Sequence, residues 1–82
     1  MSDAYDFTLV LSRQPTSSEL HRLAKAGCDD ARFTSIGAFG LAEFRRVADT
    51  FDDAVRVAII AVEHNSALHV LRVDRAELLT AV

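Results

Sequence analysis

Apolar and polar residues alternate in four short segments of the chain, and two longer segments carry apolar residues at helical spacing. The first alternating segment, residues 5–12, places Phe7, Leu9 and Leu11 on one face, as a strand does. Three further strands are predicted at residues 31–36, 41–48 and 68–73, and residues 37–40 form the hairpin connection between the first two of these.

The first helix is predicted to begin after Pro15. Thr16 and Glu19 have the spacing of a capping box, in which each side chain accepts a hydrogen bond from the other residue's backbone amide. We expect Gly27 to end this helix in a left-handed conformation. Its apolar stripe is expected to contain Leu20, Leu23 and Ala24.

The second helix, residues 50–65 with Thr50 as its cap, has more apolar surface than one small core can cover. At about 100° per residue, its core-facing stripe contains Phe51, Ala54, Val55, Ala58, Ile59 and Val62. Val57 and Ala61 widen this stripe, whereas Ile60 falls on the far side, beside Arg56. Because a monomer needs only part of a helix surface to be apolar, we predict a partner-binding surface made of Arg56, Val57, Ile60 and Ala61.

The order of these elements predicts an α+β fold in a single domain spanning residues 1–82. Right-handed crossovers would place both helices on one face of an antiparallel sheet, which is a ferredoxin-like βαββαβ sandwich. A final helical turn is expected from Asp74 through Leu78. The other face of the sheet would be mostly polar, with Thr8, Val10, Arg32, Thr34, Glu43, Arg45 and His69.

Composition limits the kinds of partner. Half of the 82 residues are hydrophobic, which suffices for a core, and the formal net charge of −3 argues against direct binding of nucleic acid. Cys28 is the only cysteine, so no internal disulfide forms, which suits a reducing cytoplasm. No signal-peptide pattern opens the sequence, and the longest apolar run, residues 57–62, is too short to span a membrane. We therefore expect a cytoplasmic protein with no membrane association.

Residues 37–44, GAFGLAEF, are similar to the third-strand motif of RNA-recognition domains. In this chain Gly37 stands where that motif has a basic residue, and Leu41 stands where it has a stacking aromatic. We therefore expect a hairpin whose aromatics, Phe44 among them, lie in the core, and we keep RNA binding as a less favoured alternative.

Catalytic and metal sites are not predicted, nor is any cofactor, so we do not expect an enzyme. Cys28 is followed by Asp29-Asp30, which would suppress thiolate formation and favours a buried loop cysteine. Asp52-Asp53 lies in the first turn of a helix, where acids are expected because of the helix dipole. The three histidines lack the close spacing of zinc ligands: His21, His64 and His69.

Several segments, in order, are similar to one family: Ala26-Gly27-Cys28-Asp29-Asp30-Ala31, Phe44-x-Arg46-x-Ala48, Ala54-x-x-x-Ala58-Ile59, Val62-Glu63, and Arg72-Val73-Asp74 with Glu77-Leu78. On these segments the chain resembles the N-terminal domain of small actinobacterial DNA-binding proteins, in which a helix-turn-helix follows. Those DNA-binding helices are not in this sequence, so the resemblance implies an accessory domain.

We therefore predict a non-enzymatic protein-interaction or regulatory module, acting as a homodimer or docked on a larger partner, such as a small regulator or an antitoxin-like protein. The alternative is a small-molecule-binding regulatory domain. Such domains favour a Gly-rich first loop, and residues 13–16 contain no glycine.

Overall fold

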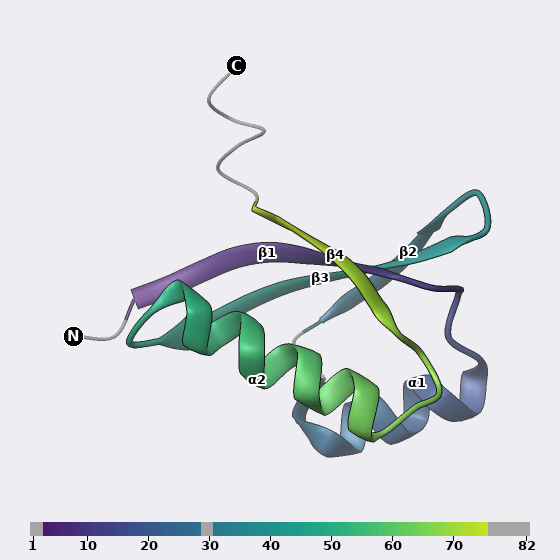
Figure 1. Ribbon diagram of the computed structural model, residues 1–82. Coiled ribbons are helices and arrows are strands. Elements are labelled where there is room, and N and C mark those ends of the chain that lie inside the picture. Colours follow the sequence, from purple (N-terminus) through teal and green to yellow (C-terminus); the bar gives the residue numbers. More distant parts are fainter. Residues whose placement is uncertain (1–2, 29–30, 76–82) are drawn as a thin grey trace.

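The computed structural model describes residues 3–28 and 31–75, which form an α+β structure of one four-stranded antiparallel sheet and two helices (Figure 1). A five-residue π-helical segment, η1, continues the first helix. In chain order the elements are β1 (Asp3–Leu11), α1 (Ser17–Leu23), η1 (Ala24–Cys28), β2 (Arg32–Ile36), β3 (Phe39–Ala48), α2 (Phe51–His64) and β4 (Val70–Arg75).

The strands are arranged in the order β2-β3-β1-β4, and all neighbouring strands are antiparallel. The helices lie together on one side of the sheet, so the described chain has two layers (Figure 1). We call the side of the sheet opposite α1 and α2 the open face. The predicted α+β class and the antiparallel sheet are therefore confirmed.

The core lies between the sheet and the helices. Phe7 of β1 stacks on Phe44 of β3 with ring centroids 5.4 Å apart, and Phe51 of α2 meets the Phe7 ring edge-on at 5.9 Å. Phe44 is buried, as predicted. The other buried apolar side chains of the described chain are Leu9, Leu11, Leu23, Cys28, Ala42, Ala54, Ala58, Val62 and Leu68.

Short-range sequence signals set the helix ends. Thr16 and Glu19 form the predicted capping box, and the Thr50 side chain accepts a hydrogen bond from the Asp53 backbone N–H at 3.1 Å. Gly27 has φ 97°, which is the left-handed conformation expected at the end of this helical segment.

The predicted apolar stripe of the first helix is partly wrong. Leu23 is buried, but Leu20 and Ala24 are exposed, and the second buried residue of α1 is Glu19. Leu23 and Glu19 are four positions apart and share one helix face. The buried face of α1 therefore combines one apolar side chain with one carboxylate.

The end of the described chain also differs from the prediction. Leu68 is buried in the loop before β4, and the strand starts at Val70. Asp74 lies inside β4, so its predicted role as a helix cap is wrong. The remainder of that predicted turn, through Leu78, lies outside the described residues.

Strand β4 pairs with β1 through an irregular register. Val10 lies opposite Arg72 while Leu11 lies opposite Val70, so Leu71 is an extra residue and forms a β-bulge. The backbone N–H of Val70 donates to the Oε2 atom of Glu63, at the end of α2, at 2.9 Å.

Candidate interaction surfaces

The outer surface of α2 carries the four residues predicted to bind a partner. Val57 and Ile60 are 55% and 58% exposed, so the predicted outward orientation of Ile60 is confirmed. Arg56 is also exposed, and its Nη2 atom lies 3.4 Å from Oδ1 of Asp53. Ala61 is half-buried and packs against the core. The sequence therefore correctly predicted that the outer surface of α2 exposes two large aliphatic side chains.

An apolar groove continues this surface toward the sheet edge. It has a volume of about 520 Å³ and runs between α2 and Val73 of β4. Its α2 wall is lined by Phe51, Val55, Ile59 and Ile60, with Asp52 and Arg56 at its polar side. Sequence reasoning assigned three of these residues, Phe51, Val55 and Ile59, to the core. They are half-buried, because the edge strand covers only part of the helix.

The open face of the sheet carries a second apolar surface that the sequence prediction missed. Ile36, Phe39 and Leu71 are 62%, 46% and 55% exposed, and the half-buried Val10 and Leu41 lie beside them. We call these five residues the hairpin-end patch. With Thr8, Glu43, Arg72 and Asp74 they line a hollow of about 670 Å³. The predicted mostly polar face is therefore wrong at this end of the sheet.

Charged residues occupy most of the rest of the open face, together with the exposed Val47 of β3. Arg45 and Asp6 are paired at 3.7 Å, and Arg72 contacts Asp74 at 3.0 Å. Arg32 of β2 lies opposite Glu43 of β3 in the register. This part of the face is therefore mostly polar, as predicted. His69 precedes β4 and is exposed.

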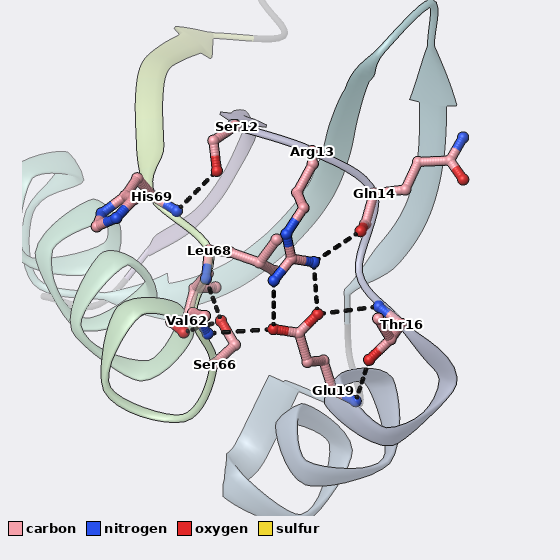
Figure 2. A network of polar contacts seen from close by, with 10 residues as sticks. Ser12, Arg13, Gln14, Thr16, Glu19, Val62, Ser66, Leu68 and His69 are labelled. Carbon is pink, nitrogen blue, oxygen red and sulfur yellow. Dashed lines mark hydrogen bonds and ion pairs between the residues drawn. The ribbon is translucent and has the colours of Figure 1, made fainter.

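The buried carboxylate of Glu19 on α1 joins two loops (Figure 2). Glu19 accepts hydrogen bonds from Nη1 and Nη2 of Arg13 at 2.7 and 3.0 Å, and from the backbone N–H groups of Thr16 and Ala67 at 3.0 and 3.1 Å. The Arg13 guanidinium, helped by the Thr16 N–H, holds the pKa of Glu19 well below its usual range, although burial opposes this shift. The network fixes the loop before α1 against the loop after α2, and every Glu19 contact is internal to the fold.

The candidate chemical residues are separated from one another in the structure. Cys28 is buried, with its Sγ atom 3.9 Å from Nη2 of Arg46, which also donates to the Gly27 carbonyl at 2.9 Å. Asp52 and Asp53 lie in the first turn of α2, as predicted. Asp29 and Asp30 lie outside the described residues. The histidines, His21, His64 and His69, are all exposed. Among residues 3–28 and 31–75, no three His, Cys, Asp or Glu side chains group in a way that could hold a metal ion.

The two aromatic residues of the segment that is similar to the RNA-recognition motif lie on opposite faces of the sheet. Phe44 faces the core, but Phe39 lies on the open face, so the prediction of a hairpin with only core aromatics is wrong for Phe39. Leu41 lies beside Phe39 on that face. A single exposed aromatic among aliphatic side chains is a poor platform for stacking successive bases.

Within the part of the chain that the structure describes, no helix is long and apolar enough to cross a membrane. Comparison of the chain with family models, with curated proteins and with solved structures gave no match in any of the three.

Proposed function

We propose that this chain is a non-enzymatic protein-interaction module that acts as a homodimer or docks on a larger partner. The observation that carries this proposal is the exposure of Val57 and Ile60 on α2, next to the apolar groove at β4. Contiguous exposed apolar surface on a small protein marks an interaction site. Burying a Val or Ile side chain completely contributes about 1.5–3 kcal/mol, so these two residues would form the centre of a contact.

The arrangement of elements supports a more specific proposal for the fold. The order strand, helix, strand, strand, helix, strand and the sheet order β2-β3-β1-β4 are those expected of a ferredoxin-like sandwich. We infer this fold for the chain. Together with the family resemblance, it supports a cytoplasmic accessory domain that regulates by protein contact.

A second candidate function is supported by the hollow on the open face. Its volume of about 670 Å³ lies within the range of small-molecule pockets, about 300–1,000 Å³. A regulatory domain that binds an apolar small molecule there is the alternative to a protein-interaction module.

The substitution Ile60→Asp tests the α2 surface. Since Ile60 is exposed, the free energy of unfolding should change by no more than about 0.5 kcal/mol. An unpaired carboxylate in a desolvated contact is costly, so the protein partners retained by the wild-type chain in quantitative affinity capture should be lost. Leu20→Asp is a matched control, because Leu20 is an exposed aliphatic residue on α1, outside both α2 and the open face.

Two results would contradict the proposal for α2. If Ile60→Asp unfolds the protein, Ile60 has a core role. If Ile60→Asp and Leu20→Asp retain the same partners as the wild type, the α2 surface does not bind them.

A further inference from the structure

The open face has a separate apolar centre at one end of the sheet. Val10 of β1 lies opposite Leu41 of β3, so two residues of the hairpin-end patch occupy the central strands. Ile36 and Phe39 lie opposite each other at the hairpin, and the bulged Leu71 borders the patch on β4. The patch therefore extends across all four strands, on the side of the sheet opposite α1 and α2.

The charges beside the patch are balanced. The open face carries three arginines, Arg32, Arg45 and Arg72, and three acids, Asp6, Glu43 and Asp74, whereas the whole chain has a net charge of −3. Because the charges on the open face balance, two copies of this acidic chain can meet there without net repulsion. Glu43, Arg72 and Asp74 line the same hollow as the patch, and Asp6 and Arg45 lie one pair of residues further from the hairpin, so charged side chains border the apolar centre.

The open face is also large enough for a stable contact. The Cα atoms extend over 35 × 28 × 16 Å, and the smallest extent matches a molecule only two layers thick. A standard interface buries about 800 Å² per partner. A face on the order of 35 × 28 Å can supply this area.

We propose that a second copy of this chain covers the open face, in a two-fold symmetric dimer that packs one hairpin-end patch on the other. This inference rests on the proposed interaction function and names the partner of the second surface. A two-fold contact uses the same patch on both copies, and a surface of balanced charge with an apolar centre is complementary to itself. The α2 surface then remains available to a different protein.

Paired double variants of the purified full chain test this assignment. Ile36→Glu with Leu71→Glu adds two acids to the open face, and Val57→Glu with Ile60→Glu adds the same charge to α2. All four side chains are more than half exposed, so urea unfolding should show that both variants fold. Sedimentation velocity over a concentration series would then give the dimer dissociation constants.

We expect the wild type to be dimeric at micromolar concentration. The open-face variant should have a dissociation constant raised by at least about a hundredfold, because like charges placed against each other in a contact cost several kcal/mol. The α2 variant should match the wild type. The variant with Ile36→Lys and Leu71→Lys should also be monomeric alone, and mixing it with the open-face Glu variant should restore a one-to-one dimer.

The contrary outcomes separate the two proposals. A monomeric wild type overturns the face-to-face dimer but leaves docking on a larger partner through α2 intact. A dimer that is lost in the α2 variant and kept in the open-face variant also overturns it, since α2 would then be the self-contact. A small molecule retained by a wild-type monomer in native mass spectrometry, and lost from the open-face variant, would assign the hollow to that ligand. The proposed interaction function itself is contradicted only if the wild type is monomeric and Ile60→Asp also retains every protein partner captured by the wild type.

Discussion

The substitution Glu19→Gln is the sharpest test of how the loops are held. The wild-type carboxylate accepts from four donors, and it is 5% exposed, while its partner Arg13 is 44% exposed. A glutamine side chain has only one acceptor oxygen. Its NH₂ group would face N–H groups that now donate to the second carboxylate oxygen, so those hydrogen bonds would be lost. A hydrogen bond to a charged group contributes about 1.5–3 kcal/mol. Because solvent screens Arg13, we expect a loss near the value of one such bond, about 2 kcal/mol.

The same contact predicts a pH dependence. Because the folded pKa of Glu19 lies below its ordinary value, the unfolded chain takes up the proton first as the pH falls. The stabilisation is fully present above the unfolded pKa of about 4.3 and decreases toward the folded pKa. For a single group the slope reaches about 1.4 kcal/mol per pH unit.

Urea unfolding of both proteins from about pH 7 to about pH 3 measures this effect. Other carboxylates titrate in the same range, so the informative quantity is the difference in unfolding free energy between wild type and Glu19→Gln. This difference should be constant near neutral pH and shrink below about pH 5. If both proteins lose stability in parallel, the carboxylate does not stabilise the fold and the assigned role of Glu19 is wrong.

Two further substitutions test the packing around the sheet. Phe44→Ala should lower the free energy of unfolding, measured by urea denaturation, by about 3–5 kcal/mol, as for other buried aromatics. A Phe44→Ala variant that folds normally but loses RNA binding would instead favour the RNA-recognition alternative. Gly40→Ala places a Cβ 2.6 Å from the backbone oxygen of Arg13, so it should cost about 1–3 kcal/mol by thermal unfolding, and an unchanged melting temperature would contradict this close approach.

Local signals in the sequence predicted much of the fold. The capping box at Thr16, the left-handed Gly27 and the 3.6-residue period of α2 each depend on residues within a few positions of one another. The period of α2 also placed Ile60 in solvent. These features follow from backbone geometry, which one stretch of chain determines by itself.

Features that depend on distant residues were missed. Glu19 is buried because Arg13 and the Ala67 N–H, 48 positions further along the chain, complete its hydrogen bonds. The hairpin-end patch escaped prediction because β3 begins at Phe39, inside the stretch assigned to the turn, and because Leu71 is bulged. A bulge shifts every later side chain by one position, and alternation alone does not reveal it.

The bulge in β4 has a consequence for the behaviour of the protein at high concentration. An outer strand with a regular row of free N–H and C=O groups is a template for further strands, and uncontrolled addition there leads to fibrils. In β4 the ladder is interrupted at Leu71, and the Val70 N–H is already occupied by Glu63. An added strand would therefore meet neither a regular row of backbone N–H and C=O groups nor a full set of free hydrogen-bonding groups on β4. This edge limits open-ended growth of the sheet and keeps the chain available for contacts of defined size.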